Sequence, residues 1–377
     1  MKRRVFVVAG EPSGDRHAAA LVRAARAADP ELAFYGIGGP ALRAAGMEVR
    51  RDCGDMAVMG LTEVLRKYGF FRRVFRETVA DLRATRPDAL LLVDYPGFNL
   101  RLASAARRLG LRVVYYICPQ VWAWNRRRVG EMARRVDRLL TILPFEAEIF
   151  ADSGLRAEYV GHPLAAATAA LRAAAPPPPP WPGAPRVALL PGSRRQEIEH
   201  ILPVLLEAAR RLEAARPGVG FLIAAADDAA AAQIAGLRAR LPGPARLQTL
   251  TGRAEQILCR ADAAWVASGT ATLEAALLDC PTVLVYRTSW LTYQAARRLI
   301  RVPHIGLVNL IRGRRVCPEL VQGEATPDRL VAALTPLLDE TPERQAMRAE
   351  FDALRAQLDG PDPARRAAAA LQDELAR

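Results

Sequence analysis

Several features that define common classes of protein are missing from this 377-residue sequence. Its five cysteines are odd in number and contain no C-x-x-C pair, which argues against a disulfide framework and a zinc site. No D-x-D motif is available to hold a divalent ion on a diphosphate. The four histidines have no metal-ligand spacing: His17, His162, His200 and His304. We therefore expect no metal or other cofactor, structural histidines, and buried thiols in a reducing compartment.

Long apolar runs are missing too. No window approaches the ~20 uninterrupted apolar residues that a membrane-spanning helix needs. The basic start leads into an apolar run of only five residues, 5–9, which is too short for a signal peptide. We predict a cytoplasmic protein whose membrane contact is peripheral. The formal charge of +13 calls for anionic partners, namely nucleic acid, phosphorylated small molecules or an acidic membrane surface.

Short apolar segments alternate with longer helical patterns, which is typical of βαβ units and parallel sheets. The predicted strands are 4–10, 33–39, 89–96, 112–119, 138–144, 157–163, 186–193, 220–227, 263–269 and 282–287. Consecutive prolines within residues 173–185 stop regular structure and mark a domain boundary. The predicted fold is α/β, with two Rossmann-like, doubly wound parallel-sheet domains facing across a cleft. The predicted divisions are an N-terminal domain at 1–172, a linker at 173–185, a C-terminal domain at 186–342 and terminal helices at 343–377.

Ligands bind at the carboxyl ends of the strands in open parallel sheets, so the residues after each strand are candidates. The first strand runs into a small-residue turn that opens a helix and offers backbone N–H groups to an anion. Its candidate substrate-binding residues are Glu11, Ser13, Gly14 and Asp15. The turn lacks the G-x-G-x-x-G pattern of dehydrogenases. The alternative is an ordinary strand-to-helix turn in which Ser13 or Asp15 is the cap.

A fully apolar strand delivers Asp94 at its carboxyl end. Partial burial at such a position raises the pKa of a carboxyl group and orients it, so Asp94 is the candidate general base. The alternative is an aspartate that caps the next helix. The following strand leads to Trp122 and Trp124, with three arginines at 126–128. This combination suits a sugar face and phosphates, although paired tryptophans are also common in cores.

Two loops in the second half are predicted to hold the diphosphate of a nucleotide at helix starts. The first combines a glycine, a hydroxyl group and an arginine: Gly192, Ser193 and Arg194. The second adds an acidic group suited to a ribose: Ser268, Gly269, Thr270 and Glu274. Two weaker candidates follow later apolar segments, Arg287 and Asn309.

A basic and aromatic segment, residues 64–76, is predicted to dock on a membrane. Its candidate membrane residues are Phe70, Phe71, Phe75, Arg72 and Arg73. Aromatic rings insert among acyl chains while arginines meet anionic headgroups. Gly69, between two apolar clusters, favours a loop or a broken helix. The alternative is a core-facing amphipathic helix with a solvated basic side.

Nine motifs occur in the order found in lipid-A-disaccharide synthases, and the chain resembles that family from residue 3 to about residue 325. The motifs are AGEPSGD, AVMGLTEVL, VDYPGFN, PQVWAW, LPFE, VGHP, LLPGSR, ASGTATLE and VNLIRGR. One departure is Val308, which stands where the family usually has proline.

The resemblance implies a B-type, inverting, metal-independent glycosyltransferase. It would join UDP-2,3-diacylglucosamine to 2,3-diacylglucosamine 1-phosphate, giving UDP and a β-1,6 disaccharide 1-phosphate for lipid A. The likeness implies roles for Asp94 as base, Arg194 as the catalytic, diphosphate-binding arginine, and Asn309 as the motif asparagine. The acceptor is expected in the first domain and the UDP-sugar mainly in the second.

The expected partners are therefore the UDP-sugar donor, the acylated acceptor and the anionic cytoplasmic face of the inner membrane, and not nucleic acid. A homodimer is left open. Two rival functions also stay open. A nucleotide-sugar epimerase of the same fold would need no lipid-facing surface, and a non-catalytic, peripheral membrane-binding module would release no UDP from a donor.

Overall fold

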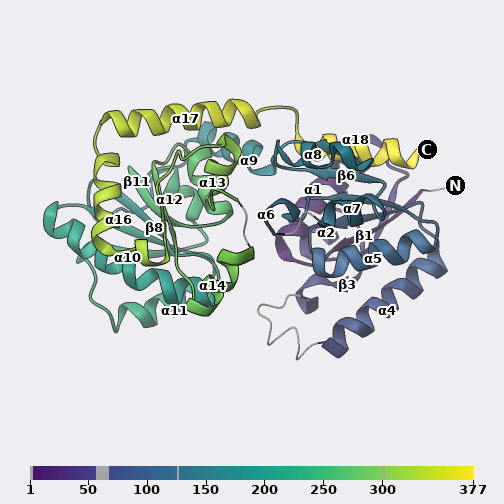
Figure 1. The fold of residues 1–377 in the computed structure, drawn as a ribbon, viewed down its shortest axis with the longest axis horizontal. Coiled ribbons are helices and arrows are strands. Elements are labelled where there is room, and N and C mark those ends of the chain that lie inside the picture. Colours follow the sequence, from purple (N-terminus) through teal and green to yellow (C-terminus); the bar gives the residue numbers. More distant parts are fainter. Residues whose placement is uncertain (1–2, 57–67, 125–126, 300–301) are drawn as a thin grey trace. The chain divides into compact units, whose positions relative to one another are not determined.

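The computed structural model describes residues 3–56, 68–124, 127–299 and 302–377 (Figure 1). Contacts divide the chain into two compact units. Unit 1 consists of Met1–Pro163 and Gly360–Arg377, and unit 2 is Leu164–Asp359. Each unit contains one parallel sheet with its own hydrophobic core.

The sheet of unit 1 has seven strands in the order β3-β2-β1-β4-β5-β6-β7. Their bounds are β1 Arg4–Ala9, β2 Ala33–Gly38, β3 Glu48–Asp52, β4 Ala89–Val93, β5 Arg112–Tyr116, β6 Arg138–Thr141 and β7 Arg156–Tyr159. The strand order reverses between β1 and β4, which pair in parallel. This is the topological switch point, where the loops after two neighbouring strands diverge and leave room for a ligand.

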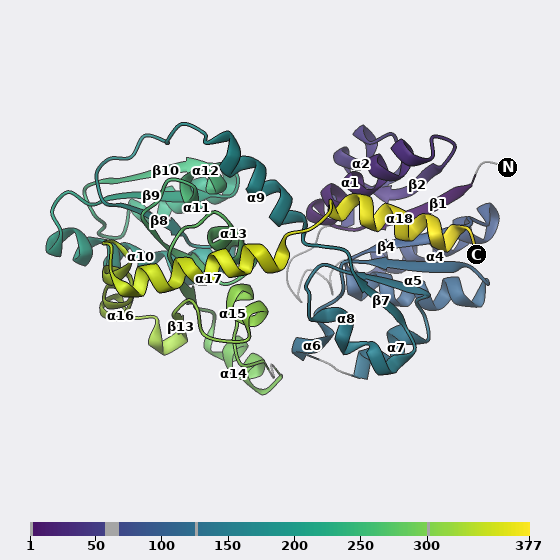
Figure 2. The same ribbon diagram turned by 90° about the horizontal axis from the view of Figure 1, so that it is seen from above.

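Helices cover both faces of this sheet. Their bounds are α1 Pro12–Ala28, α2 Pro40–Ala44, α4 Tyr68–Thr85, α5 Pro96–Arg108, α6 Val121–Trp124, α7 Arg127–Ala133, α8 Glu146–Ile149 and α18 Pro363–Leu375, with short 3₁₀ turns η1 Cys53–Met56 and η2 Ala151–Ser153. One core joins the sheet to α1, α2 and α18, and the other joins it to α4, α5 and α7. Figure 2 shows α18 lying along α1, although the two helices are at opposite ends of the sequence.

The sheet of unit 2 has six parallel strands in the order β10-β9-β8-β11-β12-β13. Their bounds are β8 Arg186–Leu190, β9 Gly220–Ala225, β10 Leu247–Thr251, β11 Ala263–Ala267, β12 Thr282–Tyr286 and β13 Glu319–Val321. The order reverses between β8 and β11, so this sheet has its own switch point.

The remaining helices are assigned to unit 2, with α9 beginning at the boundary residue. Their bounds are α9 Pro163–Ala174, α10 Arg195–Ala215, α11 Asp228–Arg238, α12 Ala254–Leu258, α13 Thr270–Leu277, α14 Trp290–Leu299, α15 Leu307–Arg312, α16 Pro327–Leu334 and α17 Pro342–Leu358, with short turns η3 Gln322–Glu324 and η4 Thr335–Leu337. Three helix starts follow one pattern: Thr326, Thr341 and Asp362 each accept a backbone N–H bond and precede a proline. Such a cap satisfies an N–H group of the first turn, and proline suits that turn because it has no N–H to satisfy.

The prediction of two Rossmann-like, doubly wound parallel sheets is confirmed. Three strands were not predicted, namely β3, β10 and β13, and each lies at an edge of its sheet. Their residues are mostly half-buried or exposed, so they carry no continuous apolar run. A buried strand of a parallel sheet shows such a run because both of its faces are covered.

The compact units and the predicted domains begin and end at different residues. The proline-rich segment 173–185 lies inside unit 2 rather than between the units. Leu171 of α9 and Trp181 of the proline-rich segment pack on the core of unit 2, which explains why both belong to it. The terminal helices are divided, because α17 packs on α13 of unit 2 and α18 packs on α1 of unit 1.

Candidate active site

The turns after β1 and β4 pack against each other at the switch point of unit 1. Gly10 lies against the ring of Tyr95, and a Cβ atom at Gly10 would stand only 2.4 Å from the ring carbon Cδ1. The Tyr95 hydroxyl donates a hydrogen bond of 3.1 Å to the carbonyl of Met56. The AGEPSGD and VDYPGFN motifs therefore form one local structure, and glycine is required at position 10.

Asp94 follows β4 and is half-buried beside these turns. Burial raises the pKa of its carboxyl group to about 6, the charge of Glu11 adds to the rise, and a hydrogen bond from the Tyr95 backbone opposes it. A carboxylate with a pKa near 6 is ionised at pH 7 and still basic enough to accept a proton in a transition state. This arrangement is suited to a general base.

Asp15 has a structural role in this turn. It is 3% exposed, and its oxygen Oδ1 accepts hydrogen bonds from the N–H groups of Gly39 at 2.6 Å and Leu42 at 3.2 Å. Oxygen Oδ2 accepts the N–H of Ala41 at 2.9 Å. Both oxygens therefore anchor the start of α2. The sequence did not predict this structural role, because it does not show that the turn before α2 lies against α1, and the substrate contact of Asp15 stays a prediction.

The other residues of the turn are distributed between surface and core. Glu11 and Ser13 are exposed, whereas Gly14 is buried with Val93 and Ala9 beside it. Glu11 is the N-cap residue of α1, but its side chain makes no capping bond. Glu11 and Ser13 thus lie at the surface, and Gly14 packs against Val93 and Ala9.

Glu146 is a buried carboxyl group that the sequence prediction missed. It is 1% exposed at the start of α8, where it accepts hydrogen bonds of 3.1 Å from Trp122 Nε1 and from the N–H of Leu143. Burial raises the pKa of Glu146 to about 7, opposed by these bonds, and the charge of Asp94 adds to the rise. The available signal was its position after a strand in the LPFE motif.

Trp122 is only 8% exposed and packs edge to face on Phe145 with a centroid distance of 5.2 Å. Its indole thus belongs largely to the core. Of the predicted arginine cluster, Arg128 is exposed and Arg126 lies outside the described residues. The indole N–H bond to Glu146 joins the segments that follow β5 and β6.

A pocket of about 270 Å³ in unit 2 brings the two predicted diphosphate loops together. It lies at the carboxyl ends of β8 and β11, on either side of the switch point. Its lining residues include Gly192, Ser193, Arg194, Ser268, Gly269, Thr270 and Glu274. Seven residues from two separate motifs thus line one hollow at a switch point, where open parallel sheets bind ligands.

The two loops differ in how their helices are capped. At α10, Glu197 accepts the N–H groups of Ser193 and Arg194 at 3.2 Å each, and its other oxygen pairs with the Arg194 guanidinium at 3.1 Å. At α13, the N-cap residue Gly269 has φ +145° and no side chain to form a cap. Since Glu197 already occupies the amides of the first loop, the guanidinium of Arg194 and the start of α13 are the better positions for a diphosphate.

Arg287 and Asn309 are not among the residues that line this pocket. Asn309 is 0% exposed, and its Nδ2 donates to the carbonyl of Cys317 at 2.9 Å and to Glu319 Oε1 at 2.8 Å. Its Oδ1 accepts the N–H groups of Val316 and Cys317. Asn309 therefore stabilises the connection from α15 to β13, and its contact with substrate stays a prediction. Val308 is fully buried in α15, so the helix accommodates valine there.

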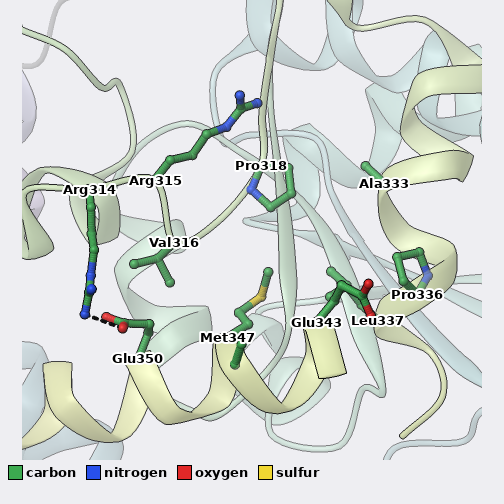
Figure 3. A pocket seen from close by; sticks show the side chains of 11 residues that line it. Arg314, Arg315, Val316, Pro318, Ala333, Pro336, Leu337, Glu343, Met347 and Glu350 are labelled. Atoms are coloured by element: carbon green, nitrogen blue, oxygen red, sulfur yellow. Dashed lines mark hydrogen bonds and ion pairs between the residues drawn. The ribbon is translucent and has the colours of Figure 1, made fainter. Parts of the chain in front are cut away.

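A second pocket, of about 530 Å³, contains none of the predicted site residues (Figure 3). The segment before β13 lines it together with α16 and α17, so it lies toward the amino end of that strand. Arg314 forms an ion pair with Glu350 at its edge, and Met347 lies in its wall. The hollow is therefore separate from the nucleotide-type pocket.

Helix α4 contains the described part of the predicted membrane segment, and residues 57–67 lie outside the described residues. Phe70, Phe71 and Phe75 are partly buried against the core of unit 1, and Phe75 packs on Phe98 at 5.7 Å. Arg72 and Arg73 are exposed. Gly69 is the second residue of α4, which is continuous from Tyr68 to Thr85. Within the described ranges, no helix is long and apolar enough to cross a bilayer.

His162 is buried, and the other three histidines are half-buried. Burial lowers the pKa of both His17 and His162, that of His162 to about 4, and the charge of His17 adds to the effect on His162. All five cysteines are free, and four are buried. In the part of the chain that the structure describes, no group of three or more His, Cys, Asp or Glu is arranged to hold a metal ion.

The overall fold is shared with solved enzymes that act on or transfer sugars. The chain matches a calicheamicin glycosyltransferase with a TM-score of 0.62 and 16% identity, over 100% of this chain and 99% of that one. It also matches a UDP-GlcNAc 2-epimerase from Neisseria meningitidis bound to UDP-GlcNAc, with a TM-score of 0.60 and 10% identity over 99% of both chains. At such identities the likeness shows the fold alone.

Sequence comparisons are more specific. A family profile described as lipid-A-disaccharide synthetase matches residues 5–372. The lipid-A-disaccharide synthase of Trichlorobacter lovleyi is 41% identical over 373 residues, which cover 97% of this chain and 96% of that protein. The enzyme of Geobacter sulfurreducens is 42% identical over 349 residues, covering 92% and 90%. With a profile match over nearly its whole length and relatives of this similarity, the chain belongs to the lipid-A-disaccharide synthase family.

Proposed function

We propose that this protein is an inverting hexosyltransferase that joins UDP-2,3-diacylglucosamine to 2,3-diacylglucosamine 1-phosphate. The products are the β-1,6 lipid A disaccharide 1-phosphate and UDP. Membership of the family supports the reaction. The observation that carries the chemistry is Asp94, a half-buried carboxyl group at a switch point with a pKa of about 6.

The proposed reaction is a single displacement. Asp94 takes the proton of the acceptor 6-hydroxyl as that oxygen forms a bond to the anomeric carbon of the donor. The bond between the anomeric carbon and the diphosphate oxygen breaks, and UDP leaves with the electron pair. Attack from the face opposite the leaving group inverts the anomeric configuration, so no covalent enzyme intermediate is needed.

The donor is assigned to the pocket of unit 2. Its lining by Arg194 and the start of α13 supports binding of a diphosphate, because a guanidinium and uncapped helix amides stabilise negative charge. Glu274 is the candidate partner of the ribose. The epimerase of the same fold that binds UDP-GlcNAc adds support for a UDP-sugar at this kind of site.

The acceptor is assigned to unit 1 and reaches it from the anionic cytoplasmic face of the inner membrane. The net charge of +13 and the exposed Arg72 and Arg73 of α4 favour a peripheral contact with acidic headgroups. Because Phe70, Phe71 and Phe75 are partly buried, their replacement would also weaken the core. A charge reversal is therefore the cleaner test. Whether the protein forms a homodimer stays a prediction, which light scattering would test by measuring the molar mass.

Replacing both Arg72 and Arg73 by Glu is expected to reduce binding to phosphatidylglycerol vesicles, since each base near such a surface adds about 1 kcal/mol. The matched control is the same reversal at Arg365 and Arg366, two exposed neighbours on α18 of the same unit. Flotation at low and high salt measures the effect, which salt should diminish. If the Arg72 and Arg73 variant binds the vesicles as well as the Arg365 and Arg366 control does, the docking surface is not on α4.

The reaction itself is tested by incubating the protein with the acylated UDP-sugar and the acylated acceptor, and detecting the disaccharide by mass spectrometry. We expect disaccharide and an equal amount of UDP only when both substrates are present. A 2-epimerase would change the donor alone, and a binding module would release no UDP. Either result would reject the proposed transferase.

A further inference from the structure

The backbone at the proposed base is held in an unusual conformation. Asp94 has φ +46° and Tyr95 has φ +49°, so two consecutive residues with side chains adopt the left-handed region. This backbone conformation is strained for any residue that carries a Cβ atom. The surrounding structure must therefore supply contacts that keep this turn in place.

Two buried side chains hold the carbonyl of Asp94. The Tyr115 hydroxyl donates to this oxygen at 2.5 Å, and Asn99 Nδ2 donates to it at 2.8 Å. Tyr115 and Asn99 are both 0% exposed. The Asp94 N–H in turn donates to the carbonyl of Tyr116 at 3.0 Å. The peptide groups on both sides of the Asp94 Cα are thus fixed, which also fixes the direction in which its side chain leaves the backbone.

The chemistry of both donors suits this task. Burial raises the pKa of Tyr115 well above its ordinary value, and the charge of Asp94 adds to the rise, so the hydroxyl keeps its proton. Asn99 also donates to the carbonyl of Val93 at 3.2 Å, but its Oδ1 is buried with no partner among the described residues. An unpaired buried oxygen destabilises the folded protein. Asn99 therefore serves through its amide N–H groups rather than through general stabilisation.

We propose that Tyr115 and Asn99 are positioning residues that aim the Asp94 carboxylate at the acceptor hydroxyl by clamping the Asp94 carbonyl. This inference rests on the proposed role of Asp94 as the base. Neither side chain touches the reacting atoms. Their effect on the reaction is exerted through Asp94 alone, because the clamp sets the orientation of that one residue.

The test is Tyr115→Phe, which removes one oxygen atom. We expect kcat to fall roughly 10- to 100-fold, since a misplacement of about 1 Å can cost that much. UDP affinity should stay unchanged, because the donor pocket belongs to unit 2. The control is Tyr116→Phe, a change at the next residue of β5, whose side chain packs in the opposite core. It should leave kcat within about twofold of the parent, because no oxygen that holds Asp94 is lost.

A double-variant cycle separates positioning from stability. In an Asp94→Asn background, Tyr115→Phe should cause no further loss of kcat, because there is no base left to aim. Asn99→Ala should likewise lower kcat in the parent and cause no further loss in the Asp94→Asn background. This variant tests the clamp if Tyr115→Phe does not fold. A normal kcat in both single variants, or a further loss in the Asp94→Asn background, would overturn the clamp. A normal kcat for Asp94→Asn itself would instead reject the proposed function.

Discussion

At the scale of single residues, the site contains acidic groups with different tasks. Asp94 has a carboxyl group with a raised pKa, Asp15 is an anchor for α2, and Glu146 is buried against Trp122. The residue types alone do not distinguish these tasks. The differences come from the surroundings of each carboxyl group. Asp15 accepts three N–H bonds, whereas burial and then the like charge of Glu11 raise the pKa of Asp94.

The pH dependence of the reaction should report Asp94. A base acts only when ionised, so kcat/KM should rise about tenfold per pH unit below pH 6 and level off above it. Glu11→Gln should move this limb to lower pH, because the charge of Glu11 helps to raise the pKa of Asp94. Glu146, Tyr115 and Cys118 also interact with Asp94, and all three are retained in this variant.

The control for the pH profile is Glu148→Gln, which removes an exposed carboxylate from α8 of the same unit. Its profile should match that of the parent. If Glu11→Gln does not shift the rise of kcat/KM with pH, either a group other than Asp94 causes that rise or the charge of Glu11 does not affect the pKa of Asp94.

Arg194→Ala should weaken UDP binding by roughly ten- to a hundredfold, since a charge-assisted bond to a diphosphate is worth about 1.5–3 kcal/mol. The loss of affinity is moderated because, before UDP binds, the Arg194 guanidinium already pairs with Glu197 at 3.1 Å and its side chain is 69% exposed. Calorimetry with UDP measures it. Arg195→Ala changes an exposed neighbour outside the pocket lining and should bind UDP normally. Equal affinities in the two variants would move the diphosphate elsewhere.

At the scale of helices and strands, apolar runs and turn residues predicted the buried strands and placed Asp94 and Arg194 at strand ends. They did not predict β3, β10 and β13, because edge strands lack continuous burial. They also gave no indication of the hydrogen bonds through which Asp15 and Asn309 hold neighbouring backbone. Their structural roles depend on contacts with α2 and with the segment before β13, which are formed only by the tertiary fold. Glu146 was missed for the same reason.

Asp15→Ala should loosen the start of α2, because three N–H groups lose their acceptor. A loss of about 2 kcal/mol would speed exchange of these amides roughly thirtyfold. Hydrogen exchange of a peptide covering residues 39–45 measures the effect. Ser13→Ala, an exposed change in the same turn, should leave exchange there unchanged. Unaltered protection in Asp15→Ala would contradict the anchoring role.

At the scale of the whole molecule, two parallel sheets each present a switch point at the carboxyl ends of their first strands. One is bordered by a carboxylate suited to proton transfer, and the other by a pocket suited to a nucleotide diphosphate. We therefore expect chemistry at the acceptor to depend on unit 1 and donor affinity to depend on unit 2.

The most direct test of this division is to measure disaccharide formation and UDP affinity for Asp94→Asn in the same preparation. General base assistance is worth ~100- to 10,000-fold, so turnover should fall at least ~100-fold. UDP affinity, measured by calorimetry, should equal that of the parent, because Asp94 belongs to unit 1 and the donor pocket to unit 2. Near-normal turnover in a folded Asp94→Asn protein, or a parallel loss of UDP affinity, would contradict the account.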